Sequence, residues 1–354
     1  MTILGIETSC DETACAVVRD GREVLANVVY TQIPLHQPYG GVVPEVASRA
    51  HIEKIHGVVQ EAMKGGVPVD AVAVTYGPGL ASSLLVGLNA AKGLALSLGV
   101  PLIGVNHIEA HLHTPFLFDV GSVATVDAPE SYMPALGLAV SGGHTTWIDM
   151  PSYGAYEIIG QTLDDAAGEA FDKAAKLLGL GYPGGPVIDR WARNVPLTDD
   201  LPRFPKGAPR PGTAALAGLD AELCVSFSGL KTALLYHVRQ HPPADDAEKA
   251  GLVAAYQEAI VGTLADRTAT ALKRRACKAL VVGGGVSLNG RLRARLAQVA
   301  EAAGVPLLLA EPKFCGDNAA MIAGLAYYRR NVTGDAAMAA DVEPTLQAGQ
   351  EPGA

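Results

Sequence analysis

The chain has 354 residues and a formal net charge of −9 at pH 7, and its length leaves room for about two domains. Its 49% hydrophobic and 18% charged residues exclude an intrinsically disordered chain. The 40 glycines and 23 prolines follow no G-X-Y period, so a collagen is excluded as well. The acidic balance disfavours sequence-independent coating of nucleic acid, because contact with a polyanion would need a local basic patch or a partner.

Neither a membrane span nor a signal peptide is indicated. Mean hydropathy is +0.21, but the chain has no run of about 18 uncharged apolar residues, and Met1–Cys10 contains Glu7 and no basic residue. The five cysteines are odd in number and form no C-x-x-C pair, which indicates a reducing compartment. We therefore expect a cytoplasmic protein whose strands are buried beneath helices on both faces.

Residues 1–132 predict a first α/β lobe. The strands expected from apolar runs between turn residues lie over 2–7, 14–19, 23–31, 69–76 and 101–105. Helical periodicity predicts helices over 45–64 and 81–98, and Asn106 is a candidate N-cap for a further helix.

The same order of elements restarts near residue 133, which predicts a second lobe over 133–330. Its expected strands lie over 135–140, 145–150, 156–162, 278–282 and 306–310, and its expected helices over 227–240, 244–273, 287–302 and 316–330. Because no residue-level repeat accompanies this order, the duplication is one of topology. Residues 195–222 predict a surface insertion, and residues 331–354 predict a flexible tail.

Two histidines follow a predicted strand in the segment His107-Ile-Glu-Ala-His111. On a helix they lie about 40° apart, so both imidazoles can reach one metal ion, although a pair of solvated helix histidines has the same spacing. The segment differs from the H-E-x-x-H motif of zinc peptidases, in which the glutamate directly follows the first histidine. Here Glu109 lies about 200° from His107, away from a metal face.

Turns of small residues follow three of the predicted strands, namely Ser9–Thr13, Ser141–Gly143 and Gly283–Gly285. In such turns backbone N–H groups can approach phosphates without a side chain in the way. One such turn indicates only a tight turn, but three predict a nucleotide cleft between the two lobes. The P-loop and Rossmann fingerprints are absent from the sequence.

Five aspartates lie near predicted helices, and each is open to interpretation as a helix cap or a solvated charge: Asp164, Asp165, Asp172, Asp189 and Asp317. Asp172 follows Asp165 by seven residues, which predicts that both lie on one helix face. Asp317 precedes an apolar helix and could be its N-cap.

Basic residues form two groups. Arg203, Lys206 and Arg210 lie in the predicted insertion, where they could contact an anionic polymer. Lys273–Arg275 end a predicted helix, where positive charge complements the helix dipole.

A series of segments, in order along the chain to about residue 330, carries a resemblance to a known family. They are Gly5–Thr13, Gly41–His51, Tyr76–Leu80, Asn106–His111, Val140–Thr145, Leu163–Asp172, Tyr182–Gly185, Gly283–Asn289 and Cys315–Asn318. In these segments the chain resembles the tRNA N6-adenosine threonylcarbamoyltransferases, once described as O-sialoglycoprotein endopeptidases. The resemblance implies an α/β fold of the actin, hexokinase and heat-shock ATPase type (ASKHA), with two duplicated lobes around a nucleotide cleft.

The resemblance also implies a metal site. His107, His111 and Asp317 would hold one ion per subunit, Fe²⁺ or alternatively Zn²⁺. Three protein ligands leave open positions for substrate oxygens. A set of two histidines and a carboxylate suits iron or zinc better than magnesium.

By the same resemblance, the family's substrate is threonylcarbamoyl-AMP, and ATP or ADP can occupy the same cleft. The threonylcarbamoyl group would move to N6 of the adenosine on the 3′ side of the anticodon (position 37), in tRNAs that read codons beginning with A. The residues implied to bind the adenylate are Ala139, Val140, Ser141, Gly142, Gly143, Asp172, Gly185, Asp189 and Asn289. As a hypothesis, Asp11 or Glu12 takes the amine proton or positions the substrate.

The implied partners are tRNA and, in bacteria, a related metal-free actin-like subunit and a small P-loop ATPase. The net charge of −9 fits such dependence on partners. Three alternatives remain: a metallopeptidase, an actin-like small-molecule kinase and a non-catalytic scaffold. The place of Glu109 disfavours the first, the paired histidines are unexplained by the second, and the intact set of His107, His111 and Asp317 disfavours the third.

Overall fold

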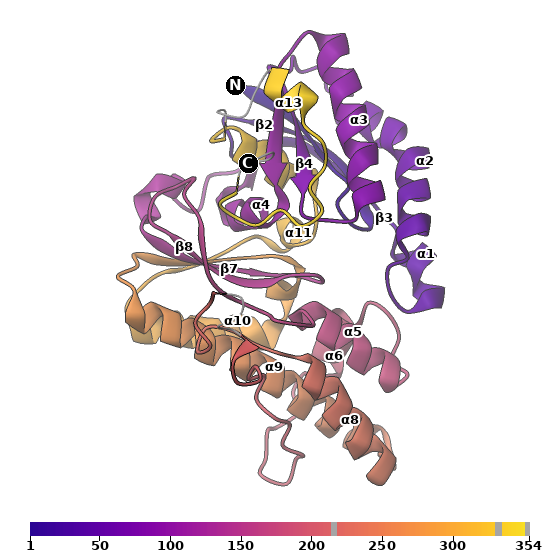
Figure 1. Ribbon diagram of the computed structural model, residues 1–354, viewed down its shortest axis with the longest axis vertical. Coiled ribbons are helices and arrows are strands. Elements are labelled where there is room, and N and C mark those ends of the chain that lie inside the picture. Colours follow the sequence, from indigo (N-terminus) through magenta and orange to yellow (C-terminus); the bar gives the residue numbers. More distant parts are fainter. Residues whose placement is uncertain (214–217, 330–334, 351–354) are drawn as a thin grey trace. The chain divides into compact units, whose positions relative to one another are not determined.

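A computed structural model describes residues 1–213, 218–329 and 335–350 (Figure 1). The chain divides into two compact units, each with its own sheet. The first unit comprises Met1–Met133, Met150–Glu157 and Leu309–Ala354, and the second comprises Pro134–Asp149 and Ile158–Leu308.

The first unit is built on a six-stranded sheet in the order β5-β4-β1-β2-β3-β6. Its strands are β1 (Thr2–Glu7), β2 (Glu12–Arg19), β3 (Glu23–Thr31), β4 (Ala71–Gly77), β5 (Leu102–Asn106) and β6 (Phe118–Asp119). Neighbours β1, β2 and β3 pair antiparallel, whereas β1, β4 and β5 pair parallel. The predicted strands are confirmed, and the short β6 was not predicted.

The second unit repeats this arrangement in a five-stranded sheet, in the order β11-β10-β7-β8-β9. Its strands are β7 (Ala135–Val140), β8 (Thr145–Met150), β9 (Glu157–Gln161), β10 (Ala279–Gly283) and β11 (Leu307–Leu309). The order around β7 is the order around β1, strand for strand, so the predicted duplication of topology is confirmed.

Helices cover both faces of the first sheet. Successive residues of β1 alternate between two hydrophobic clusters, since Ile3 packs with α12 (Ala319–Ala326) and Leu4 packs with α2 (Pro44–Ala62) and α3 (Ala81–Leu98). The other helices of this unit are α1 (Ile33–His36), α4 (His107–His113), α11 (Pro312–Cys315) and α13 (Asp335–Ala339), with 3₁₀ turns at Gln37–Tyr39, Thr114–Phe116 and Pro129–Tyr132.

The packing of helix α12 shows to which of the two units the chain after residue 309 belongs. All of its residues are buried, and they share a hydrophobic cluster with β1 and β2. The predicted division had placed residues 309–330 in the second lobe, whereas residues 309–329 pack in the first unit. Of the helix predicted over 316–330, α12 covers Ala319–Ala326, and the separate α11 ends before this range, at Cys315.

Helix α3 is long and apolar enough to cross a membrane by length and composition alone, with a mean hydropathy of 1.3. It contains Lys92, and one third of it is buried. Its buried residues include Leu84, Leu88 and Ala91. This buried face contacts β4 and α2, as expected for a helix that covers a sheet.

Five helices lie in the described part of the second unit. They are α5 (Ala167–Leu177), α6 (Gly184–Ala192), α8 (Ser228–Gln240), α9 (Asp246–Arg274) and α10 (Gly290–Ala303), with a 3₁₀ turn at Gly285–Leu288. The predicted helices of this region are thus confirmed, and α10 begins later than expected because the 3₁₀ turn precedes it. Within the predicted insertion, residues 214–217 lie outside the described residues.

The prediction of a flexible tail is wrong for residues 335–350. Tyr76 Oη donates to Ala337 O at 2.5 Å, Lys92 Nζ donates to Ala340 O at 2.7 Å, and Glu343 N donates to Tyr76 O at 2.9 Å. These hydrogen bonds therefore tie the segment to the first unit, and its composition gave no signal for them. Residues 331–334 and 351–354 lie outside the described residues.

Candidate metal centre and nucleotide site

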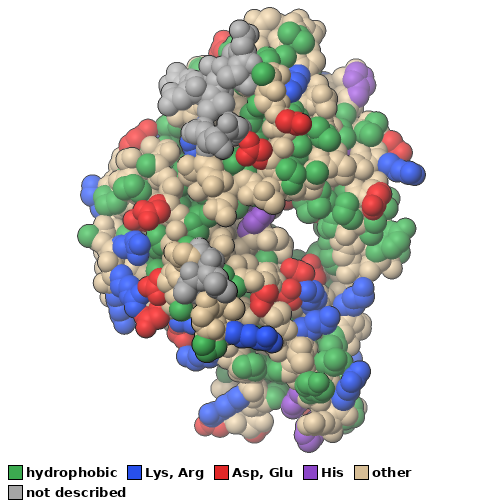
Figure 2. All heavy atoms as spheres, in the orientation of Figure 1, with side chains coloured by type: hydrophobic (Ala, Val, Ile, Leu, Met, Phe, Trp, Pro, Cys, Tyr) green, Lys and Arg blue, Asp and Glu red, His purple; other side chains and the backbone are tan. Residues whose placement is uncertain are grey.

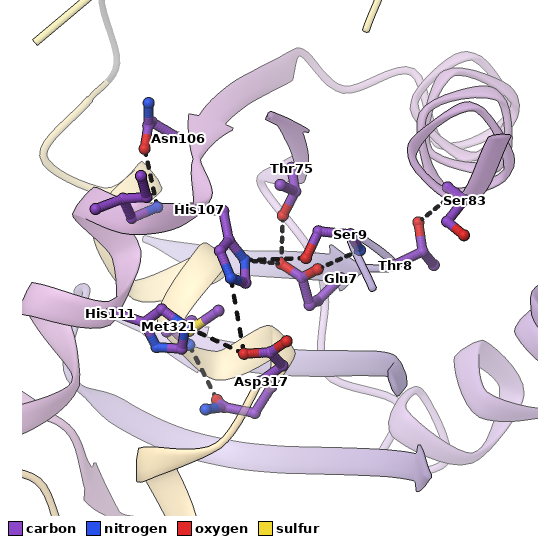
Figure 3. Close-up of polar contacts among 12 residues, drawn as sticks. Glu7, Thr8, Ser9, Thr75, Ser83, Asn106, His107, His111, Asp317 and Met321 are labelled. Atoms are coloured by element: carbon purple, nitrogen blue, oxygen red, sulfur yellow. Dashed lines mark hydrogen bonds and ion pairs between the residues drawn. The ribbon is translucent and has the colours of Figure 1, made fainter. Parts of the chain in front are cut away.

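Helix α4 presents the two histidines, and its start is defined by a side-chain cap. Asn106 Oδ1 accepts hydrogen bonds from Ile108 N at 2.9 Å and Glu109 N at 3.2 Å (Figure 3). These bonds satisfy two of the donors that a helix N-terminus leaves unpaired. The predicted N-cap is confirmed, and every residue of α4 is buried.

His107, His111 and Asp317 converge, as Figure 3 shows. Asp317 Oδ1 lies 3.1 Å from His111 Nε2 and 3.7 Å from His107 Nε2, and the candidate ligand atoms all lie within 4.8 Å of one another. The two imidazole centroids are 4.6 Å apart. The histidines are therefore not a solvated helix pair, and the geometry suits a single metal ion.

Asp317 is not the N-cap of α12, although the sequence allowed that role. Asn318 caps α12 instead, because its Oδ1 accepts from Met321 N at 3.2 Å. The side chain of Asp317 remains 19% exposed, unlike those of both histidines. Its carboxylate can thus approach an ion from the accessible side of the cluster.

The state of His111 tests whether these residues fit a metal. Its side chain is 1% exposed, and neither ring nitrogen has a hydrogen-bond partner within the described part of the chain. Its Nε2 lies 3.1 Å from Oδ1 of Asp317, the third candidate ligand. Burial lowers the pKa of His111, which favours the neutral imidazole. A buried neutral imidazole with an unused lone pair fits a metal ligand.

Glu7 is not one of the three candidate ligands but contacts one of them, His107. Its Oε2 lies 3.2 Å from His107 Nδ1 and accepts from Thr75 Oγ1 at 2.5 Å, while Oε1 accepts from Ser9 N. A proton shared between Nδ1 and the carboxylate leaves Nε2 of His107 facing Asp317. Sequence reasoning named Glu7 only as part of a motif, although its position at the end of β1 was a usable signal.

The charges of Glu7 and His107 are coupled. Burial lowers the pKa of His107, but the negative charges of Glu7 and Asp317 outweigh burial and raise it to about 9. Burial raises the pKa of Glu7, yet the charge and hydrogen bond of His107 prevail and lower it. An ion bound at Nε2 would take the place of the proton there.

Glu109 lies away from this cluster, as the helical geometry predicted. It is fully buried, its Oε2 pairs with Arg329 Nη2, and its Oε1 accepts from Gly349 N at 2.8 Å. A carboxylate held in this way cannot serve as the base of a metallopeptidase, so this alternative is not favoured.

The turn between β1 and β2 carries the two candidate catalytic carboxylates. Its backbone is fixed where Gln32 N donates to Asp11 O at 3.0 Å. Glu12 accepts from Thr31 Oγ1 at 3.2 Å. Burial, assisted by the charges of Asp11 and Asp317, raises the pKa of Glu12 well above its usual range. Glu12 thus has the environment of a group that can take up a proton.

In the second unit, β7 ends at Ala139 and Val140, and the turn that follows meets the N-terminus of α5. Gly168 N donates to Ser141 O at 3.2 Å and Glu169 N to Gly142 O at 3.1 Å. Apart from the adjoining residues of the chain, no atom of the described residues lies within 4 Å of the position that a Cβ would take at Gly142 or Gly143. The turn therefore offers bare backbone beside open space, as phosphate-binding turns do.

The glycine turn after β10 packs against the end of β7. A Cβ at Gly284 would lie 2.3 Å from Val140 O, and its φ of +98° is one that L side chains rarely adopt. Glycine is thus required here by close packing, whereas at Gly142 and Gly143 the space is open. The two turns lie side by side at the carboxyl ends of parallel strands, the usual ligand-binding edge of such a sheet.

The remaining residues that were predicted to contact the nucleotide lie on or beside α5, α6 and α10. Hydrogen bonds connect these helices through them, and we call these residues the linked series. Asp172 Oδ1 accepts from Gly184 N at 2.6 Å, and Asp189 Oδ1 accepts from Gly290 N at 3.2 Å. Asn289 caps α10 and donates from Nδ2 to Gln257 Oε1 at 2.8 Å. The Cβ position of Gly185 is open, as at the turn after β7.

Asp165 does not share a helix face with Asp172, so that prediction is wrong. Helix α5 begins at Ala167, and Asp165 precedes it and pairs with Lys173 Nζ at 2.7 Å. The neighbouring Asp164 accepts from the hydroxyls and backbone at Ser226–Ser228, before and at the start of α8. Neither residue is part of the linked series.

A cavity of about 620 Å³ adjoins this series between α6, α9 and α10. Its lining includes Asp189, Gln257 and Gly290, together with Arg193, Glu258 and Arg291. Arg291 Nε pairs with Glu258 Oε2 at 2.7 Å. Of these six residues, sequence reasoning named only Asp189, because the others come from separate segments that meet only in the fold.

The basic residues singled out in the sequence are largely paired with acids. Lys206 Nζ lies 2.8 Å from Asp266 Oδ2, Arg274 pairs with Asp220 and Glu222, and Arg275 Nε lies 3.4 Å from Asp149 Oδ2. On the face shown in Figure 2, Lys and Arg side chains lie beside Asp and Glu rather than in one basic stripe.

Comparison with solved structures defines the class of fold. HypF in its phosphate- and nucleotide-bound form is 13% identical with a TM-score of 0.56, over 95% of this chain and 47% of HypF. Component A of the (R)-2-hydroxyglutaryl-CoA dehydratase of Acidaminococcus fermentans is 13% identical with a TM-score of 0.50, over 93% and 98% of the two chains. The chain thus has the α/β fold of the ASKHA type, as predicted.

Comparison of sequences defines the family. The family model for tRNA N6-adenosine threonylcarbamoyltransferase matches residues 23–324. Relatives of that name are 51% identical in Anaeromyxobacter dehalogenans, over 91% of this chain and 92% of the relative, and 46% identical in Clostridium perfringens, over 98% of both. This chain belongs to the tRNA N6-adenosine threonylcarbamoyltransferase family, and it is an enzyme of that family.

Proposed function

We propose that this enzyme transfers the threonylcarbamoyl group of threonylcarbamoyl-AMP to N6 of the adenosine on the 3′ side of a tRNA anticodon. The observation that carries the proposal is the convergence of His107, His111 and Asp317 within 4.8 Å, in a chain of this family. The two histidines are buried and Glu7 orients one of them, which is typical of a built metal centre rather than a chance cluster.

We propose that these three residues hold one Fe²⁺ ion, with Zn²⁺ as the alternative. Two imidazoles and a carboxylate suit either metal, and three protein ligands leave positions open. When bound, the ion supplies a Lewis acid that polarises acyl or phosphate oxygens of the substrate. The contribution of the chain is to hold His107 and His111 in a buried, pre-oriented geometry through Glu7 and the cap of α4.

We propose that the adenylate binds the second unit over Ala139–Gly143. The open Cβ positions of Gly142, Gly143 and Gly185 support approach of substrate to bare backbone. Asp172 Oδ1 and Asp189 Oδ1 each accept from a backbone N–H, and Asp189 Oδ2 also lies 3.5 Å from Arg193 Nη2. A carboxylate offers about four lone-pair sites, so ribose hydroxyls can donate to the same groups. The adjoining cavity of about 620 Å³ is of the size of a small-molecule site, and ATP or ADP would occupy the same place.

The transfer forms a bond between N6 and the carbamoyl carbon and breaks the bond from that carbon to the phosphate oxygen, so that AMP leaves. The nucleophilic amine loses one proton. We propose Glu12, with Asp11 beside it, as the group that takes this proton or positions the amine. The raised pKa of Glu12 supports this role, because a carboxylate with a raised pKa binds a proton more readily than an ordinary one.

We propose that tRNA is bound with the help of partners, namely a related metal-free actin-like subunit and a small P-loop ATPase, in the cytoplasm. A chain with a net charge of −9 repels a polyanion overall, and its basic side chains at 206, 274 and 275 are paired with acids. The two compact units are proposed as the two lobes of the enzyme. The sequence match to the family and the paired histidines leave the kinase and scaffold alternatives unsupported.

A transfer assay with a matched pair of histidine variants tests this function. Metal-loaded protein is incubated with unmodified tRNA, threonylcarbamoyl-AMP and the partner subunits, and the tRNA is digested for mass analysis. We expect threonylcarbamoyladenosine from the wild type and from the control His56→Ala, since His56 is an exposed residue of α2. We expect His111→Ala to lose more than the 10–100-fold typical of residues that only orient a ligand.

Absence of product from folded, metal-loaded wild type would contradict the proposed function. Equal turnover by His111→Ala would contradict the role of the metal site. In the same assay, normal turnover by Glu12→Gln and by Asp11→Asn would remove both residues as candidates for the base.

A further inference from the structure

Residues 343–350, here named the C-terminal strap, run along the first unit and past α4 (the yellow segment in Figure 1). The strap begins where Glu343 N donates to Tyr76 O at 2.9 Å, next to β4. It then meets the residues around the metal-ligand helix. Asn106 Nδ2 donates to Gln347 O at 3.0 Å, and Gly349 N donates to Glu109 Oε1 at 2.8 Å.

Glu109 is the centre of these contacts. It is a fully buried carboxylate. One of its oxygens pairs with the guanidinium of Arg329, and the other accepts a hydrogen bond from Gly349 N of the strap. The guanidinium also lies over the ring of Tyr156, 5.3 Å from its centroid. A buried charge with both oxygens engaged is costly to disturb, since removal of a partner leaves it uncompensated.

These contacts affect the orientation of the two histidines because α4, which carries them, is short. Seven residues are too few for a helix to be stable by itself, so tertiary contacts must set its orientation. Glu7 holds the face that carries His107, whereas Glu109 lies about 200° around the axis and is held by Arg329 and the strap. Asn106, directly before His107, both caps the helix and binds the strap.

We propose that the C-terminal strap and Arg329, acting through Glu109 and Asn106, position α4 so that His107 and His111 present their Nε2 atoms to one ion. Glu109 is a positioning residue in this arrangement. The inference rests on the metal site of the proposed function. It assigns a role to the glutamate between the two histidines, which the transfer chemistry leaves unused.

Gly349 offers a way to move the strap without changing α4. Its φ is +84°, and a Cβ there would lie 2.2 Å from Tyr156 O. Because of this clash, the strap must move when Gly349 is replaced by alanine. Gly121→Ala is the matched control, because Gly121 has a φ of +79° and open space around its Cβ position. Both substitutions introduce the same backbone strain in the first unit, and only one displaces the strap.

The experiment is a Co²⁺ titration of the metal-stripped full-length chain, followed by the visible absorption of bound Co²⁺, with thermal unfolding measured alongside. We expect Gly349→Ala to raise the dissociation constant about 10–100-fold, as for residues that orient metal ligands, and Gly121→Ala to leave it within about twofold. Glu109→Gln is expected to weaken binding in the same direction. In the transfer assay kcat should fall for Gly349→Ala while KM for tRNA stays unchanged.

Wild-type affinity in folded Gly349→Ala and Glu109→Gln would overturn the inference while leaving the metal site intact. If Gly349→Ala does not fold, Glu109→Gln decides in the same titration. If the wild type gives the same Co²⁺ spectrum as His111→Ala, the proposed metal site itself fails, and the positioning role fails with it.

Discussion

The two sheets of this chain have the same strand order but carry different chemistry at equivalent turns. Glu7, the last residue of β1, and Ser9, in the turn that follows, place their side chains against His107. After β7, the equivalent turn is Ser141-Gly142-Gly143, with open space where two side chains would lie. Topology therefore determines where a site can form, and the turn residues determine which chemistry the site can perform.

The packing behind these turns is alike in both units. A Cβ at Gly79, after β4, would lie 2.6 Å from Ser9 O, and a Cβ at Gly284, after β10, would lie 2.3 Å from Val140 O. In each unit a glycine turn thus presses on the backbone near the turn of the neighbouring strand. The difference between the units lies in the side chains that the turn after the first strand presents.

The largest expected effect comes from removing the charge at the first turn. Glu7→Gln leaves His107 without the carboxylate that orients it, so we expect metal affinity to fall about 10–100-fold with little change in nucleotide affinity. Isothermal titration with Zn²⁺ and with an adenylate measures both quantities. Asp20→Asn, at an exposed ion pair with the N-terminus, serves as a control that should leave both unchanged. An unaltered Zn²⁺ affinity in Glu7→Gln would remove Glu7 from the metal centre.

A smaller effect is expected from filling the second turn. Gly142→Val places methyl groups in the open space beside the backbone, and we expect the affinity for an adenylate to fall about tenfold, the equivalent of a modest steric clash. Metal affinity should be unchanged. Gly93→Ala in α3, where the Cβ position is also open, is the control. Adenylate affinity of the wild-type level in Gly142→Val would place the nucleotide elsewhere.

The smallest expected effect concerns the start of α8 in the second unit. Asp164 accepts four hydrogen bonds from Ser226–Ser228; burial raises its pKa, but these bonds outweigh burial and lower it. Its stabilisation is therefore present above the unfolded value of about 3.9 and is lost as pH falls through the folded value. Because the group is exposed, we expect Asp164→Asn to cost only about 1 kcal/mol at pH 7 and less at pH 3.

Thermal unfolding at the two pH values measures this difference. Asp199→Asn, which removes a fully exposed carboxylate on the same unit, should change the midpoint little at either pH. A loss at pH 3 as large as that at pH 7 would show that the ionised carboxylate is not the cause.

The sequence was informative wherever structure depends on neighbouring residues. The strands were predictable because buried runs such as Thr2–Glu7 end at polar or glycine turns, and α4 because Asn106 is a local cap. The histidine spacing and the family motifs together indicated the metal site. What the sequence could not indicate was contact between distant segments.

Three examples show this limit. Residues 309–329 pack in the first unit because α12 covers β1, which is distant in sequence. Residues 335–350 are ordered by hydrogen bonds to β4 and α4 that their composition does not reveal. The sequence left Asp317 open to interpretation as the cap of α12, and only the geometry assigns the cap to Asn318 and leaves Asp317 to the metal cluster.

The most direct test of the account is to locate the metal. Crystals of the full-length chain loaded with Zn²⁺ and measured at the zinc absorption edge would give an anomalous difference map. The account predicts one peak in the first unit, about 2.0–2.2 Å from His107 Nε2, His111 Nε2 and a carboxylate oxygen of Asp317. A loaded crystal with no peak there, or with its peak at the turn after β7, would contradict the division of chemistry between the two units.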